Sequence, residues 1–304
     1  MRPVIMSTDP GIDDAVAIAL AVASPALDVK LLCPVAGNVD RAKTTANTLK
    51  LLAFLQATIP VVPGSARPLL RAPQAAADIH GESGLDGFAF PQPTQVADTT
   101  QTAVAAMHQV VSTSVAPVTL IAIGPLTDIA LFAHLYPEDL PNVAELVIMG
   151  GALGRGNLGV LAEFNFACDP EAAAMVAALP VPLRIAPLEV GQQARLLPAT
   201  LAQIKTLGPV GAMFDGLFSH YRGGSMQTGL KMYDALAVAL VLAPELFTEV
   251  ATHLDVALAD PLTAGASLFD LKGYRQQADN VHVATAVDAA GFARWLVAVL
   301  GKLA

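Results

Sequence analysis

Cysteine is almost absent from this chain, which has only Cys33 and Cys168 and no CxxC pair. Two cysteines so far apart in the sequence do not make a disulfide framework. The scarcity of cysteine therefore excludes a small fold held together by disulfides, and it favours a reducing compartment.

Charge is also sparse, and its balance is acidic. Charged residues make up 14% of the 304 residues, the formal net charge is −9, and 54% of the residues are hydrophobic. An acidic surface repels phosphate backbones, which argues against general binding of nucleic acid. The high apolar content argues against disorder and is ample for a large buried core.

Long hydrophobic runs are missing as well, and we expect no secretory leader. The N-terminal MRPVIMSTDP does not place a charged segment before a long apolar one, as a signal peptide does. The longest apolar runs, AVAIALAVA and ALAVALVLA, reach about half of the ~20 residues that span a membrane. We therefore expect a cytoplasmic protein without a membrane partner, in which these runs form buried helices.

What the chain does contain is an alternation of short β-branched runs with longer runs rich in alanine and leucine. This alternation is typical of an α/β fold, in which helices flank an open, mostly parallel, twisted sheet. Continuous apolar strands fit burial on both faces of such a sheet. The predicted strands are 3–7, 29–37, 59–62, 118–124, 145–151, 182–190 and 281–287, and the predicted helices are 13–24, 41–56, 101–114, 126–135, 170–178, 198–220, 232–242 and 289–304.

Neither a break in composition nor an internal repeat divides the chain, so residues 1–304 are predicted to form a single domain. Two segments have the composition of loops. Residues 64–100 are rich in proline, glycine and alanine, and residues 221–229 are polar and rich in glycine. Long loops in α/β proteins usually flank the site at the carboxyl ends of the strands.

The most unusual stretch is VIMSTDPGIDDA, residues 4–15, where Asp9, Asp13 and Asp14 follow closely after the end of the first predicted strand. In a parallel sheet this end faces the ligand crevice. Carboxylates so close together raise the pKa of at least one of them unless a cation lies between them. A hard divalent cation needs several oxygen ligands, and clustered carboxylates supply them. The stretch therefore predicts a metal site.

Two other interpretations of this stretch arise from these residues alone, and Ser7 argues against the second. Asp13 can be the N-cap of the first helix, with Asp14 solvated and Asp9 in the turn. Phosphatases of the haloacid-dehalogenase type carry Asp-x-Asp after the first strand, and the first Asp is the nucleophile. Here Ser7 stands at that position, and a serine cannot form the acyl-phosphate.

DPGIDDA resembles the signature of the inosine–uridine-type nucleoside hydrolases, and further motifs of that family follow in order along nearly the whole chain. Each motif alone is a weak signal, whereas the ordered series is a strong one that favours a site over a cap and a turn. The motifs are GN at 37–38, HGESGLDG from 80, IGPLTDIA from 123, IMGGALGRGN ending at 157, AEFNFACDPEAA from 162, YDALAVALVLAPELF from 233 and NVHVATAVDAAGFARWL from 280.

The resemblance implies a nucleoside hydrolase fold with a Rossmann-like core and a Ca²⁺-dependent activity. The implied reaction is hydrolysis of the N-glycosidic bond of a ribonucleoside to the free base and ribose. Asp9 matches the carboxylate that contacts both the calcium ion and the attacking water and removes the proton of that water. The implied metal ligands are Asp9, Asp14, Asp234 and the backbone carbonyl of Ile123.

The same resemblance surrounds the substrate with polar side chains. His80 lies in the loop that is expected beside the nucleobase. The residues matched to the ribose are Asp13, Asn38 and Asp234 for its 2′- and 3′-hydroxyls, and Asn157, Glu163 and Asn165 for the rest of the sugar, including its 5′-hydroxyl.

Three positions depart from the family pattern. Ser7 replaces a further Asp, which is not a direct metal ligand. Tyr233 replaces a His that is thought to protonate the leaving base; a tyrosine can stack on the base or donate a hydrogen bond, and Tyr221 is a possible substitute. PLEVGQQA, in which Glu189, Val190 and Gly191 lie, replaces the usual LDVTHQA. The last two departures leave the choice of base and the general acid open.

Two alternatives to an ordinary nucleoside hydrolase follow from these departures. One is a Ca²⁺-dependent nucleoside-binding protein that has lost turnover, although the retained Asp9 argues against it. The other is hydrolysis of an unusual N-riboside, such as one with a modified base. In each case the partner is a small ribonucleoside, and by analogy with the family we expect a homodimer or homotetramer active in purine or pyrimidine salvage.

Overall fold

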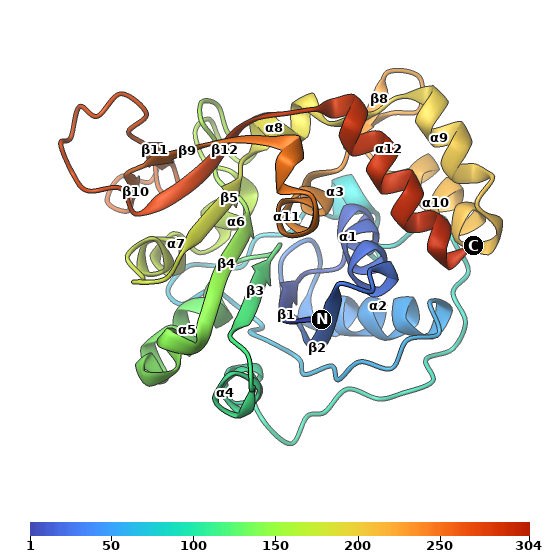
Figure 1. Cartoon of the computed structure of the whole chain (residues 1–304), viewed down its shortest axis with the longest axis horizontal. Helices are drawn as coiled ribbons and strands as arrows, with labels where there is room; N and C mark the ends of the chain where they lie inside the picture. Colours follow the sequence, from blue (N-terminus) through green and yellow to red (C-terminus); the bar gives the residue numbers. More distant parts are fainter.

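The computed structural model describes residues 1–304, and its centre is a seven-stranded sheet in the order β2-β1-β3-β4-β5-β12-β9 (Figure 1). Six of these strands pair in parallel, and the edge strand β9 is antiparallel to β12. The predicted open, mostly parallel α/β sheet is therefore confirmed. The strands are β1 (Arg2–Thr8), β2 (Leu27–Pro34), β3 (Val118–Ala122), β4 (Val143–Met149), β5 (Leu183–Ala186), β9 (Phe247–Thr252) and β12 (Val281–Val287).

Helices cover both faces of the sheet because successive side chains of each buried strand point to opposite faces. In β1, for example, Val4 and Met6 join one apolar cluster, whereas Ile5 joins the other. The first cluster contains side chains of α1, α11 and α12, and the second contains side chains of α4, α5 and α7. Those helices are α1 (Ile12–Ala23), α4 (Ala103–Thr113), α5 (Thr127–Leu135), α7 (Pro170–Ala177), α11 (Tyr233–Leu242) and α12 (Ala289–Leu300).

The remaining elements are short or lie at the periphery. Residues 198–220, predicted as one helix, form two helices that are separated at Thr206–Leu207. The elements are the helices α2 (Arg41–Phe54), α3 (Ala77–His80), α6 (Phe164–Cys168), α8 (Leu188–Gln193), α9 (Pro198–Lys205) and α10 (Gly208–His220), the 3₁₀ turns η1 (Pro137–Asn142), η2 (Pro244–Leu246) and η3 (Gly301–Leu303), and the strands β6 (Arg195–Leu196), β7 (Gly224–Ser225), β8 (Gly229–Lys231), β10 (Leu254–Val256) and β11 (Ser267–Phe269).

Three further predictions from the sequence were wrong in detail. Residues 59–62 form no strand and make only the single bridge Leu32–Val61. The strand predicted at 182–190 ends at Ala186, and α8 follows it. The segment 221–229, predicted as a loop, contains β7 and the start of β8, which pair in a small antiparallel sheet.

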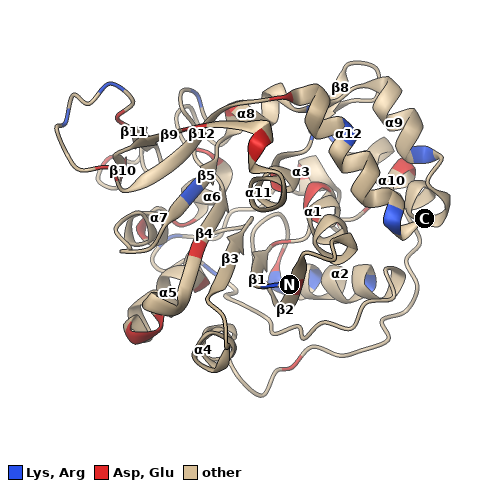
Figure 2. Cartoon of the chain, in the orientation of Figure 1, with Lys and Arg blue, Asp and Glu red and all other residues tan.

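The sheet contains few charged residues on its central strands (Figure 2). An exception is Arg184 of β5, whose guanidinium pairs with Glu249 of β9 at 2.5 Å and with Glu145 of β4 at 3.4 Å. These ion pairs connect three strands at one end of the sheet. None of the helices has the length and apolar character needed to cross a bilayer.

Candidate active site

A cavity of about 340 Å³ lies beyond the carboxyl ends of the central strands. This volume is within the range of small-molecule sites, ~300–1,000 Å³. Sequence reasoning placed Asp9 and Asp14 in the same site; they are not part of the cavity lining but are buried beside it. The predicted residues that line the cavity are Asp13, Asn38, His80, Ile123, Asn157, Glu163, Asn165, Tyr221, Tyr233 and Asp234.

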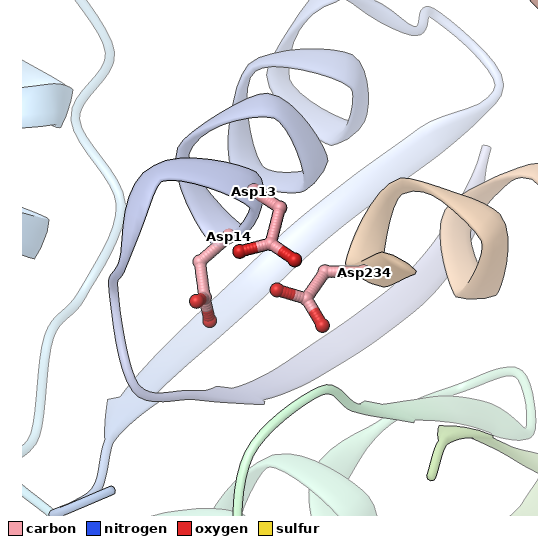
Figure 3. A group of neighbouring side chains, drawn as sticks. All are labelled: Asp13, Asp14 and Asp234. Carbon is pink, nitrogen blue, oxygen red and sulfur yellow. The ribbon is translucent and has the colours of Figure 1, made fainter. Parts of the chain in front are cut away.

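Three carboxylates from two helices face one another at this cavity. Asp13 and Asp14 lie in the first turn of α1, and Asp234 lies in the first turn of α11 (Figure 3). One oxygen of each lies within 4.8 Å of the others. Burial and the neighbouring carboxylates raise the pKa of Asp234 well above its ordinary value, and burial raises the pKa of Asp13 to about 6. The arrangement concentrates negative charge that only protons or a cation can neutralise.

Asp14 is held by hydrogen bonds on both of its carboxylate oxygens. Its Oδ1 accepts from Thr8 Oγ1 at 2.7 Å and from the backbone N–H of Asp9 at 3.1 Å. Its Oδ2 accepts from the backbone N–H of Gly11 at 2.9 Å and from Asn38 Nδ2 at 3.1 Å. The interpretation of Asp14 as a solvated residue and of Asp13 as the N-cap is therefore wrong, because Asp14 is fully buried and the N-cap is Gly11.

Asp9 has a different environment, with one satisfied oxygen and one free oxygen. Its Oδ2 accepts from the backbone N–H of Asn38 at 2.7 Å, whereas its buried Oδ1 has no hydrogen-bond partner. A Cβ at Gly37 or Gly124 would lie 2.0 Å or 2.5 Å from these oxygens, so both positions require glycine. Burial, and next the Asp14 charge, raises the pKa of Asp9 well above its usual range. A buried carboxylate oxygen without a donor is suited to meet a cation or a water.

The far wall of the cavity is built from the segment between β4 and α6. Asn165 Nδ2 donates to the carbonyl oxygens of Ile123 and Met149, each at 3.1 Å. Glu163 accepts from the backbone N–H groups of Asn165 and Gly151, each at 3.0 Å, and burial raises its pKa to about 7. Backbone amides thus fix the direction of the Glu163 carboxylate.

Asn157 is the most exposed of the predicted sugar-binding residues. Its Oδ1 accepts from the backbone N–H of Phe164 at 2.8 Å, which closes the loop between β4 and α6. The Oδ1 group of this side chain is thus engaged, and its Nδ2 group stays available to donate a hydrogen bond.

His80 and Tyr221 lie next to each other and next to Asp13. The backbone N–H of Ile12 donates to His80 Nδ1 at 3.1 Å, so a neutral His80 carries its proton on Nε2. Burial lowers the pKa of His80 to about 4. Tyr221 donates its hydroxyl to Asp13 Oδ2 at 3.2 Å, and its ring centre lies 5.5 Å from that of His80.

Several residues that shape the site were not predicted from the sequence. Lys231 and Arg222 line the cavity; the Gly-rich segment 221–229 was expected to flank the site, but neither of these residues was singled out. Glu189, a departure from the family pattern without a stated role, accepts from the backbone N–H groups of Leu153 at 2.8 Å and Gly154 at 2.9 Å. It therefore holds the same loop that carries Asn157.

Residues 4–294 of the sequence match the family described as inosine-uridine preferring nucleoside hydrolase. Among its relatives, the non-specific ribonucleoside hydrolase RihC of Escherichia fergusonii is 45% identical over 300 residues, covering 99% of this chain and 98% of the relative. The protein of the same name from Salmonella schwarzengrund is 46% identical over 296 residues, covering 97% and 96%.

Solved structures of ribonucleoside hydrolases share the whole fold. The purine-preferring ribonucleoside hydrolase from Gardnerella vaginalis superimposes with a TM-score of 0.90 at 25% identity, covering 99% of each chain. A plant nucleoside hydrolase superimposes with a TM-score of 0.89 at 28% identity, again covering 99% of each chain. The similarity therefore extends from the first strand to the last helix.

Proposed function

Because the chain belongs to the inosine-uridine preferring nucleoside hydrolase family and is a ribonucleoside hydrolase, we propose that Asp9 is the base of its reaction and that Ca²⁺ is its cofactor. The established reaction is hydrolysis of the N-glycosidic bond, in which water replaces the base at the ribose. The observation that carries the proposal is the buried, unpartnered Asp9 Oδ1 beside the carboxylates of Asp13, Asp14 and Asp234.

The donor set fits a hard divalent cation. All the charged candidates are carboxylates, and the proposed ligands are Asp9, Asp14, Asp234 and the carbonyl of Ile123, since Ca²⁺ prefers several oxygen ligands. Asp13 belongs to the cluster of neighbouring carboxylates together with Asp14 and Asp234. Asp9 lies beside this cluster, and its backbone N–H donates a hydrogen bond to Asp14. When bound, Ca²⁺ would lower the pKa of an adjacent water and offset the repulsion among these groups.

Asp9 is proposed to take the proton of the attacking water. Its Oδ1 is free to accept a hydrogen bond, while the N–H of Asn38 and the two glycines hold the carboxylate in place. A positioned carboxylate base contributes ~10²–10⁴-fold to a hydrolysis rate. Carboxylates around the sugar also stabilise the positive charge that develops on the ribose ring as the bond to the base breaks.

The ribose is proposed to lie between α1 and the segment after β4. Asp13 and Asp234 accept from its hydroxyls, and Asn38, whose Nδ2 already donates to Asp9 O and Asp14 Oδ2, accepts through its Oδ1. Asn157, Glu163 and Asn165 are proposed to contact the rest of the sugar, since all three line the cavity. Acceptors arranged in this way match the several donors of a ribose.

The base is proposed to leave on the side of His80, Tyr221 and Tyr233. His80 offers an Nε2–H donor, because its Nδ1 accepts from the backbone of Ile12. Burial raises the pKa of both tyrosines above the usual value, so each acts as a neutral donor or as a ring surface and not as a strong acid.

The substrate range and the setting are inferred from the relatives. Two of them are named non-specific ribonucleoside hydrolases, and we therefore propose that this enzyme accepts both purine and pyrimidine ribonucleosides. A cytoplasmic role in nucleoside salvage, a homo-oligomeric state and one domain over residues 1–304 remain predictions. The relatives and the structural neighbours do not favour the alternative of a binding protein without turnover.

A nucleoside panel tests the proposal. Inosine, adenosine, uridine, cytidine and a modified nucleoside would be incubated with the wild-type enzyme, with and without EGTA, and ribose release measured by a reducing-sugar assay. We expect activity that EGTA abolishes and Ca²⁺ restores, and an Asp9→Asn variant reduced at least ~10²-fold. The control is Asp279→Asn, which changes an exposed carboxylate. Full activity in Asp9→Asn, or in EGTA, contradicts the proposed mechanism.

A further inference from the structure

Gly191, in the middle of α8, lies directly against the ring of Tyr233. A Cβ added at Gly191 would be 2.1 Å from Tyr233 Cδ1 and 2.5 Å from Cε1. These distances are far shorter than any real contact, so no side chain fits there while the ring stays in place. The backbone of Gly191 does not have a positive φ, and the position therefore requires glycine for the close approach and not for a turn.

Tyr233 is placed where its ring affects the substrate. It is the first residue of α11, immediately before Asp234, and it lines the cavity together with Asp13 and Asp234. Its side chain is partly buried. Helix α8 blocks one side of the ring, and Tyr233 also lines the cavity. A side chain added at Gly191 would therefore displace the ring into the space available to the ligand.

Helix α8 also holds the loop between β4 and α6, which forms the far wall of the cavity. Glu189 accepts hydrogen bonds from the backbone N–H groups of Leu153 and Gly154, in the loop that carries Asn157. Gly191, two residues later, receives the Tyr233 ring. Gly191 and Tyr233, two of the positions that depart from the pattern of the resembled family, are thus in contact, and the missing side chain on α8 leaves room for the ring on α11.

We infer that Gly191 is a positioning residue that sets the place of the Tyr233 ring and thereby the size of base that the cavity accepts. This inference rests on the proposed binding of the base near Tyr233. A side chain at Gly191 narrows the cavity, and a purine, which has two fused rings, loses more than a pyrimidine. Steric differences of this size change kcat/KM by ~10–200-fold in enzyme pockets.

The first test is the ratio of kcat/KM for inosine to kcat/KM for uridine in Gly191→Ala and Gly191→Thr. We expect the ratio to fall at least ~10-fold in Gly191→Ala and further in Gly191→Thr. The control is Gly301→Ala, because Gly301 has an ordinary helical φ of −59° and a Cβ there meets nothing closer than 3.8 Å. An unchanged ratio in both Gly191 variants would overturn the inference.

The second test is a double-mutant cycle with Tyr233→Ala. If Gly191 acts through the ring, Gly191→Ala lowers kcat/KM for inosine in the wild-type background and changes it by less than ~2-fold in the Tyr233→Ala background. Equal losses in both backgrounds would refute the inference, since Gly191 would then act on the fold of α8. If Gly191→Ala does not fold, recovery of the thermal unfolding transition in the double variant supports the contact, and its absence counts against it.

These outcomes are separate from a failure of the proposed mechanism. A wild-type enzyme that is fully active in EGTA would remove the role of Ca²⁺ and leave the comparison of inosine with uridine intact. If the ratio of kcat/KM for inosine to kcat/KM for uridine is the same in the Gly191 variants as in the wild type, only the role of Gly191 is refuted.

Discussion

Removal of Ca²⁺ should lower the thermal stability of the protein, and the loss should depend on pH. Asp9, Asp13, Asp14 and Asp234 are all buried, and each has a pKa above its ordinary value. For Asp13 the folded-state pKa is about 6, against an ordinary 3.8. The folded metal-free protein therefore binds protons more tightly than the unfolded chain does, and this stabilisation is present at low pH and is lost as the pH rises through about 6.

Ca²⁺ and protons compete for the same carboxylates, so the stabilisation by Ca²⁺ should be small near pH 5 and large at pH 8. At a free Ca²⁺ concentration of about 100 times Kd, binding to the folded state alone contributes ~2.7 kcal/mol. The entropy of unfolding is ~2.1 cal/mol/K per residue, or ~0.6 kcal/mol/K for the 304 residues. The expected increase in Tm at pH 8 is therefore about 4 °C.

Differential scanning calorimetry in EGTA and in Ca²⁺, at pH 5 and pH 8, measures this difference. Asp14→Asn removes one ligand charge, and it should therefore lose most of the Ca²⁺-dependent shift in Tm. The shift is measured within each variant, so a change in the Tm of the Ca²⁺-free variant does not affect the comparison. Asp279→Asn, an exposed carboxylate, should keep all of it. A Tm at pH 8 that is the same in EGTA and in Ca²⁺, or an undiminished shift in Asp14→Asn, would refute the proposed cation site.

Three further predictions concern other parts of the structure. Arg184→Ala should lower the free energy of unfolding by ~2–3 kcal/mol, because it leaves the partly buried Glu249 without its partner; urea denaturation measures the change, and a loss below ~0.5 kcal/mol contradicts it. Glu189→Ala should raise KM about 10-fold with little change in kcat, since it removes the acceptor of two backbone amides in the loop that carries Asn157. An unaltered KM in steady-state kinetics would show that this loop does not need Glu189 to bind the substrate. Tyr221→Phe should reduce kcat/KM about 10-fold by removing the donor to Asp13, and a change below twofold would exclude that hydrogen bond from substrate binding.

Much of the fold could be predicted from the sequence, because the strands of a parallel sheet are buried on both faces and appear as continuous apolar runs. The runs at β1, β3 and β12 were correctly identified. The run at 59–62 has the same character, yet it makes one bridge only, since Pro60 within it and Pro63 after it have no N–H to donate to a strand ladder. The edge strand β9 was missed because its side chains alternate in exposure and carry no apolar run.

The hairpin of β7 and β8 was missed for a different reason. Its composition, rich in glycine, is that of a loop, and two of its glycines, Gly224 and Gly229, have positive φ values of 146° and 99°. Composition indicates that such positions turn, but it does not indicate that the flanking residues pair with each other. The third strand of this sheet, β6, comes from Arg195 and Leu196, which pair with β8 and are distant in the sequence from the turn.

By itself, the sequence determined the α/β class, the position of the acidic cluster at the end of the first strand and, through its ordered motifs, the family. These features depend on local patterns, which short stretches of chain carry within themselves. The resemblance already grouped Asp234 with Asp14, but the tertiary structure alone decided the contacts: it brought oxygens of Asp13, Asp14 and Asp234 within 4.8 Å of one another, left one oxygen of Asp9 unpartnered, and placed Gly191 against Tyr233. Contacts of this kind join side chains that are far apart in sequence, and their distances arise only when helices and strands pack together.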